Sequence, residues 1–268
     1  MLSLGRLLIF FPLLLRLASG EAEEDGSCEA SPSPPLSASP ASSPSSSSAS
    51  SKSSSSSFPN FITILESLGV AKECEAENKE CSNSTVVARQ LEASWEKFNI
   101  TCRQEAACLT GLMLLESGNA TFKRNKFPGV PGQGTCNMQM CPFNLKWAQD
   151  LAKEESADGK GTSQLAKYAD VQTLECSAKG CKDAEKCDEV LTDVLKTDKG
   201  NLFTPAWFYA TQCNKTEIKE GLKNDVKFCP DYLTECVGTN GTDEERTRRN
   251  QKVFEAFDVV GKTTCVPL

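Results

Sequence analysis

One carboxylate stands out because of the helix predicted to end at it. Glu116 follows the apolar run 112–115 (LMLL) and precedes a Ser-Gly step. Partial burial and the negative end of the helix dipole disfavour an ionised side chain there, whereas hydrogen bonds from loop amides favour it. If the first two effects dominate, Glu116 keeps its proton near neutral pH, as a general acid acting on a glycosidic oxygen must. The alternative is an ordinary solvated glutamate at a helix end.

The complete absence of histidine narrows the available chemistry. It removes the usual general base of serine and cysteine hydrolases and the commonest metal ligand. Catalysis would have to use carboxylates, Tyr, Lys or Cys. A zinc site is the rival interpretation of Cys176, Cys181 and Cys187, but these lack the tight Cys-x-x-Cys pairs that a tetrahedral site prefers. We therefore predict no metal and no cofactor.

The segment after Glu116 carries a second signal. Residues 114–140 read LLESGNATFKRNKFPGVPGQGTCNMQM. This order of apolar helix, Glu-Ser, Phe, glycine-bearing loop and Met-Gln step resembles the goose-type lysozyme and lytic transglycosylase superfamily. It is also similar to secreted lysozyme-like proteins of fungi, which are similar again to 206–213 (AWFYATQC) and 235–246 (ECVGTNGTDEER). Taken alone, the PGVPGQG stretch is explained by surface turns.

The resemblance implies a mainly α, lysozyme-like fold and one reaction. Glu116 would donate a proton to the leaving oxygen between two amino sugars, and the sugar's acetamido group or a water would complete the cleavage. The polymer would be peptidoglycan or, less favoured, chitin. The residues expected to contact it are Ser117, Gly134, Asn137, Met138, Gln139 and Tyr209. For Tyr209 and its neighbour Trp207, packing in the core is the alternative to stacking on a sugar.

Three departures from the family pattern favour a second hypothesis, a noncatalytic secreted binder or effector on the same scaffold. The Gly-Leu-Met-Gln step of the bacterial enzymes is replaced by 136–139 (CNMQ). Cys141 could close a small ring with Cys136 or fasten the loop elsewhere. Asn119 begins an Asn-x-Thr sequon three residues after Glu116, and a glycan there would obstruct the cleft.

The N-terminal region is predicted to lie outside the folded domain. Residues 1–20 combine Arg6, a short apolar run and small residues before Gly20, which is typical of a secretory signal peptide; an uncleaved membrane anchor is the alternative. Residues 21–57 are rich in Ser and Pro and too polar to build a core, so we expect a disordered stalk. Cys28 lies in this segment ahead of its serine-rich part and would pair with a domain cysteine or with another molecule. Residues 58–268 then form one domain.

Cysteine content, sequons and charge agree with secretion. The fourteen cysteines allow up to seven disulfides in an oxidising compartment. Sequons begin at Asn83, Asn99, Asn119, Asn214 and Asn240. Without Arg6 and Arg16, 27 basic residues face 36 acidic ones, a balance that disfavours nucleic acid and gives no attraction to a membrane. We expect an extracellular monomer whose partner is a polysaccharide.

Apolar periodicity predicts a mainly helical domain with no repeated strand pattern. The most apolar helix, from about Arg103 to Ser117, is expected in the middle of the core. The charged run 243–249 is expected to be a solvated helix face, capped by Thr242 or Asp243. The other predicted helices are centred on 61–68, 87–98, 145–153, 165–174, 184–195, 205–212, 217–228 and 244–257.

Overall fold

The computed structural model describes residues 60–126, 129–157 and 163–268, all of which belong to one compact unit, Ser54–Leu268. The expected signal peptide and stalk, including Cys28, lie outside the described residues. This part of the chain is mainly α-helical, as the sequence predicts. No helix in it is long and apolar enough to cross a membrane.

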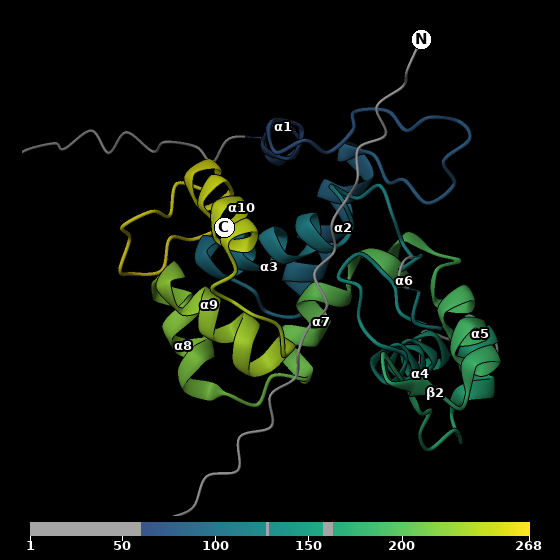
Figure 1. Ribbon diagram of the computed structural model, residues 1–268. Helices are drawn as coiled ribbons and strands as arrows, with labels where there is room; N and C mark the ends of the chain where they lie inside the picture. Colours follow the sequence, from purple (N-terminus) through teal and green to yellow (C-terminus); the bar gives the residue numbers. More distant parts are fainter. Residues whose placement is uncertain (1–59, 127–128, 158–162) are drawn as a thin grey trace, which may run out of the picture. The chain divides into compact units, whose positions relative to one another are not determined.

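The elements alternate long helices with short turns (Figure 1). The α-helices are α1 (Phe61–Ser67), α2 (Ser84–Lys97), α3 (Arg103–Glu116), α4 (Cys141–Ala157), α5 (Ala184–Val194), α6 (Asp198–Leu202), α7 (Thr204–Thr211), α8 (Thr216–Asn224), α9 (Cys229–Tyr232) and α10 (Glu244–Ala256). Two 3-10 turns, η1 (Gln164–Tyr168) and η2 (Val226–Phe228), and one π-helical turn, η3 (Leu233–Val237), accompany them. Strands β1 (Cys176–Ser177) and β2 (Gly180–Cys181) form one antiparallel hairpin.

Helix α3 is the centre of the first hydrophobic core, because every residue from Gln104 to Leu114 is buried. Its start is capped by Glu105, whose Oε2 accepts the backbone N–H of Cys102 at 3.3 Å. Figure 1 shows α10, α7 and α8 around it. Helix α10 lies close to α3 at Gly111, where an added β-carbon would lie 2.3 Å from Oδ1 of Asn250. The glycine therefore permits this helix pair.

A second hydrophobic core lies between α4, α5 and η1, and α7 joins the two cores. Tyr209 of α7 packs in the first core, whereas Trp207 and Phe208 pack in the second. Trp207 also meets Trp147 of α4, with ring centroids 5.3 Å apart. The aromatic run of α7 is thus buried, in agreement with the packing alternative for Trp207 and Tyr209.

Six disulfides link the described residues, so the domain is disulfide-rich as predicted. They join Cys74–Cys81, Cys102–Cys265, Cys108–Cys229, Cys141–Cys187, Cys176–Cys181 and Cys213–Cys236. The small ring between Cys136 and Cys141 is not formed, because Cys141 fastens the start of α4 to α5. Cys136 is the one unpaired cysteine of the described ranges and is buried. Burial raises the pKa of its thiol to about 12, so it is not a reactive nucleophile.

The predicted helix at 165–174 is wrong in its second half. Only η1 forms, and the chain then extends toward β1. The side-chain amide of Gln149 donates to the carbonyls of Tyr168 and Val171, at 2.9 and 2.8 Å, and so provides partners outside a helix. The short elements α6 and α9 and the hairpin were not predicted either. Helix α4 starts earlier than predicted, at Cys141.

Candidate functional site

Glu116 is the last residue of α3, and its side chain is 24 % exposed. Its Oε1 accepts a hydrogen bond from Nη2 of Arg246 at 2.6 Å. No residue in the described part of the chain bonds to Oε2. A guanidinium stabilises the carboxylate form of its partner. Glu116 is therefore held by a long-range ion pair, which the apolar helix alone did not suggest.

The arginines of α10 were missed as site residues. Arg246 is only 15 % exposed, and its Nη1 is buried without a partner among the described residues. One turn later, Nη1 of Arg249 donates to Oδ1 of Asn119. The sequence suggested only a solvated face here. The one available signal was the position of the run within a stretch that resembles the lysozyme-like family.

Ser117 fixes the tight turn that follows Glu116. Its buried hydroxyl donates to the carbonyl of Met113 at 2.7 Å and accepts from the backbone N–H of Ala120 at 2.9 Å. Asn119 and Ala120 both have positive φ values, 58° and 62°. The Ser117 hydroxyl therefore holds a backbone conformation that costs an ordinary residue about 1–2 kcal/mol. Its role is to set the exit from α3.

The loop 133–139 lies beside this turn. The backbone N–H of Thr135 donates to the carbonyl of Lys123 at 2.8 Å, and isolated antiparallel bridges join Gly134 to Arg124 and to Gln139. Only glycine fits at 134, because an added β-carbon would lie 2.5 Å from the Lys123 carbonyl. The loop is therefore fixed to the chain that leaves Glu116.

The polar side chains of this loop point inward. Asn137 and Gln139 are buried; Oδ1 of Asn137 accepts from the hydroxyl of Thr135 at 2.8 Å, and Nε2 of Gln139 donates to Asn144 at 2.8 Å. Met138 is half-buried and has a φ of 48°. Of the six described non-glycine residues with positive φ, four lie between Asn119 and Met138. Such concentrated strain is typical of functional sites.

Tyr209 is not brought to Glu116. Its buried hydroxyl donates to Oε1 of Glu105 at 2.9 Å, near the start of α3. Glu105 and Glu116 are separated by eleven residues of helix, or about 16 Å at 1.5 Å per residue. Burial raises the pKa of Glu105, although the Tyr209 bond opposes the shift. These two residues line a separate polar cavity of about 470 Å³ between α2, α7 and α8.

The three sulfurs considered for zinc are close together. The Sγ atoms of Cys176, Cys181 and Cys187 lie within 4.8 Å of one another. They belong to two disulfides, Cys176–Cys181 and Cys141–Cys187. Zinc binds thiolates, which disulfide sulfurs cannot supply. In the structure the first disulfide closes the β1–β2 hairpin, and the second joins α4 to α5 beside it.

The five sequons differ in accessibility. Asn99, Asn214 and Asn240 are exposed. Asn83 caps α2 by accepting the N–H of Val86 at 2.9 Å. Asn119 is half-buried, and a β-carbon added at Gly69 would lie 2.8 Å from its Nδ2 atom. The side-chain amide of Asn119, the sequon nearest Glu116, thus packs against the backbone of Gly69.

Comparison with known proteins gives one partial relative. A bifunctional dioxygenase–epoxy alcohol synthase of Fusarium oxysporum is 37 % identical over 159 residues, which are 59 % of this chain but 11 % of that protein. The chain thus spans about a tenth of the length of the curated relative that it matches. No protein-family model matches the chain, and no solved structure matches it.

Proposed function

We propose that this protein is a secreted glycosidase or lytic transglycosylase that cleaves amino-sugar polymers, with Glu116 as the general acid. One observation carries the proposal. A partly buried carboxylate, with one oxygen unbound by any described residue, ends the central helix beside a strained turn and a loop fixed to that turn. The lysozyme-like order of residues 114–140 supports it. Peptidoglycan is the favoured polymer.

The reaction needs one proton and one electron-pair donor. Oε2 of Glu116 delivers its proton to the glycosidic oxygen as the bond from that oxygen to the anomeric carbon breaks. The acetamido oxygen of the same sugar, or a water, then supplies the electron pair to the anomeric carbon. Arg246 keeps Oε1 in place, so the proton can be carried only on Oε2. A single carboxylate is sufficient, unlike in the paired-carboxylate glycosidases.

The buried polar network supports such a site by holding the loop rigid. The side chains of Asn137 and Gln139 face Thr135 and Asn144, which leaves Met138 as the partly exposed side chain of the Asn-Met-Gln step. We propose that Met138 and the backbone of the loop contact the sugar, with Asn137 and Gln139 positioning them. Six disulfides, the sequons and the N-terminal apolar run support secretion.

The test is loss of turbidity of bacterial cell walls with purified full-length protein. Wild type should clear the suspension and Glu116→Gln should lose at least about 100-fold in rate, since general acids contribute about 10²–10⁴-fold. Glu245→Gln removes an exposed helix glutamate and should retain full rate. The enzyme proposal fails if wild type and Glu116→Gln release equally little product from both peptidoglycan and chitin.

A second candidate is a noncatalytic carbohydrate-binding or effector protein on the same scaffold. It is favoured by the Arg246 contact, because an ion pair between α3 and α10 gives Glu116 a structural role that needs no catalysis. This candidate predicts that wild type and Glu116→Gln bind insoluble peptidoglycan with equal affinity and release no sugar. We assign no oxygenase chemistry by way of the relative, because the matched residues are only 11 % of that protein.

A further inference from the structure

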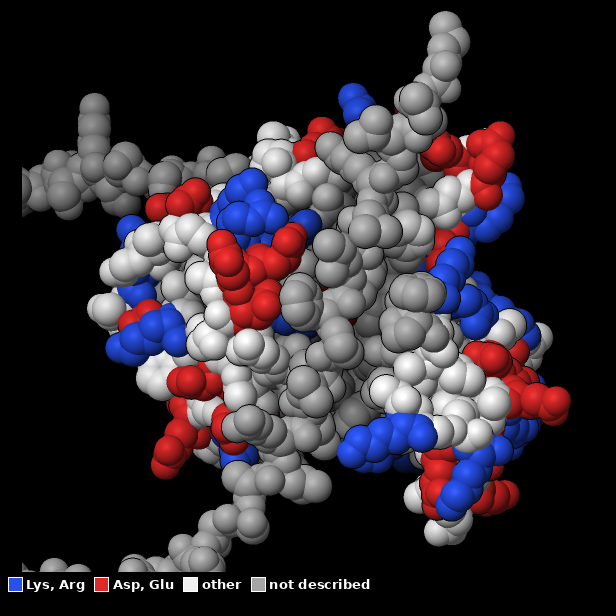
Figure 2. Space-filling view, in the orientation of Figure 1, with Lys and Arg blue, Asp and Glu red and all other residues white. Residues whose placement is uncertain are grey.

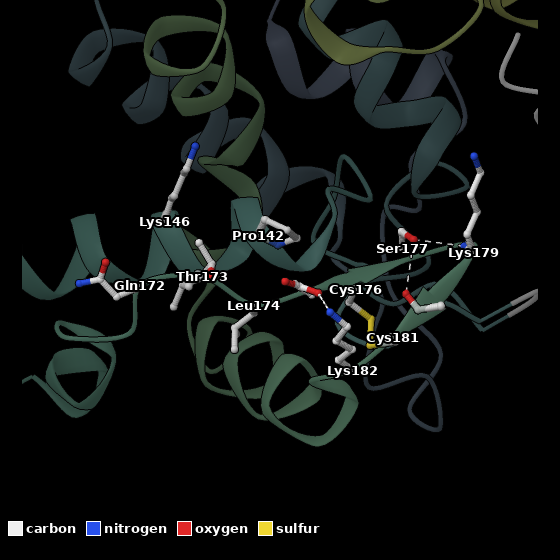
Figure 3. A pocket seen from close by; sticks show the side chains of 13 residues that line it. Pro142, Lys146, Gln172, Thr173, Leu174, Cys176, Ser177, Lys179, Cys181 and Lys182 are labelled. Carbon is white, nitrogen blue, oxygen red and sulfur yellow. Dashed lines mark hydrogen bonds and ion pairs between the residues drawn. A yellow bond between two sulfur atoms is a disulfide. The ribbon is translucent and has the colours of Figure 1, made fainter. Parts of the chain in front are cut away.

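An open groove of about 720 Å³ lies beside the β1–β2 hairpin (Figure 3). One wall is the extended segment from Gln172 through β1, and another is the start of α4. Its floor is apolar, because Leu145 and Leu174 are 2 % and 6 % exposed. Glu116 does not line this groove, so a ligand bound here is independent of the proposed glycosidase site.

The segment before β1 has an unpaired backbone. Burial alternates from Leu174 to Ser177, as expected for an extended chain with side chains on alternate faces. The carbonyl of Glu175 accepts the N–H of Lys182 at 2.9 Å, and the N–H of Glu175 donates to the Asp183 carboxylate at 2.6 Å, so contacts with the second strand extend one residue before β1. Residues 172–174 make no backbone hydrogen bond within the described chain. The second strand cannot pair with them, because it turns into α5 at Ala184.

In an extended chain the backbone groups alternate in direction with every residue, which identifies the one among residues 172–174 that can pair with an added strand. Backbone groups of every second residue point to the same side of a strand. Glu175 faces β2, and Thr173 therefore presents its N–H and C=O to the position that β2 would occupy if it continued. Unpaired groups of this kind are a template for an added strand.

The charged side chains around the groove indicate which kind of peptide strand it would bind. Figure 3 shows Lys146 of α4 and Lys179 of the hairpin tip at opposite ends of the lining, and both side chains are exposed. In the described residues neither has a carboxylate partner; the Lys146 ammonium contacts the neutral Oε1 of Gln212, at 3.3 Å. Lys182 is already paired with Glu175. Two unneutralised cations over an apolar floor fit a peptide with acidic and apolar residues in alternation.

On the face visible in Figure 2, Lys and Arg lie interspersed with Asp and Glu. We propose that the groove binds an extended acidic peptide segment of a partner protein as an added antiparallel strand opposite Thr173. Its apolar side chains contact Leu145 and Leu174, and its carboxylates contact Lys146 and Lys179.

The experiment uses fluorescence anisotropy with full-length protein and a labelled peptide of sequence EVEVEVE. Wild type should bind it, whereas the KVKVKVK peptide and an EVEVEVE peptide with N-methylated valines should bind at least tenfold more weakly. The double variant Lys146→Glu, Lys179→Glu should also lose at least tenfold. Lys153→Glu, also on α4 but outside this groove, should change affinity less than twofold.

The backbone contribution is tested separately. Thr173→Pro removes the N–H assigned by this proposal to the added strand and should weaken binding at least tenfold, whereas Gln172→Pro removes the one assigned to the opposite side of the extended chain and should have little effect. The N-methylated peptide tests the same hydrogen bonds on unaltered protein if a proline variant fails to fold. Equal binding of methylated and unmethylated peptides overturns the proposal. So does competition by heparin as strong as that by EVEVEVE, since the groove would then recognise charge alone.

Discussion

The ion pair between Glu116 and Arg246 should stabilise the contact of α3 with α10, whether or not Glu116 is catalytic. The side chains are 24 % and 15 % exposed, and Nη2 lies 2.6 Å from Oε1. Exposed pairs contribute about 0.2–1 kcal/mol, and hydrogen bonds to charged groups about 1.5–3 kcal/mol. We therefore expect a coupling free energy of about 1–2 kcal/mol. In a domain of this size, Glu116→Gln should lower Tm by about 2–8 °C.

A double-mutant cycle measures this coupling directly. Glu116→Gln, Arg246→Met and the double variant are unfolded in urea with disulfides intact, and the free energies of unfolding are combined. Glu245 and Arg248 provide a matched control on the same helix, with Nη2 and Oε1 3.0 Å apart but side chains 56 % and 57 % exposed. That pair should couple by less than about 0.5 kcal/mol and lose its coupling in 1 M salt. Equal coupling in the two cycles would refute the reasoning.

Single contacts elsewhere in the fold give three further predictions. Gly111→Ala should lower the free energy of unfolding by about 1–3 kcal/mol in urea titrations, because the new methyl group meets Asn250 at 2.3 Å; a gain would mean that α10 shifts freely. Since burial raises the folded-state pKa of Glu105 above 4.5, folding binds a proton there. Wild type should therefore lose stability relative to Glu105→Gln as pH rises above about 4.5, and thermal melts in which that difference is constant with pH contradict this. Peptide mapping by mass spectrometry should find Asn119 unglycosylated and Asn214 glycosylated, because only the latter amide is exposed; full occupancy of Asn119 would contradict the packing described here.

The position of Glu116 could be predicted from sequence because it is a local property. Apolar residues on all sides of 106–115 require a buried helix, and the Ser-Gly step ends that helix directly after the carboxylate. The turn-rich loop that contains Gly134 was likewise expected from its local Pro-Gly steps. The partner of Glu116 could not be predicted, because Arg246 is 130 residues away and follows a helix pattern common to solvated faces.

The same distinction explains why one predicted helix was wrong and why other features stayed open at the level of sequence. Leu165 to Leu174 has helical periodicity, but whether a helix continues there depends on Gln149, which binds the carbonyls from another element. The pairing of Cys141 with Cys187 depends on how α4 packs on α5, and no spacing rule gives it. Tyr209 has the amphipathic ring that suits a sugar, yet the packing of α7 directs it to Glu105.

The sequence by itself determined a cysteine-rich, mainly helical domain with a carboxylate at the end of its most apolar helix, because composition, periodicity and helix termination act over a few residues. Tertiary structure alone decided which charge meets that carboxylate, which cysteines pair and which backbone edge stays unpaired within the described chain. Each of these depends on the distance between groups far apart in the chain. That distance is fixed only when the helices pack.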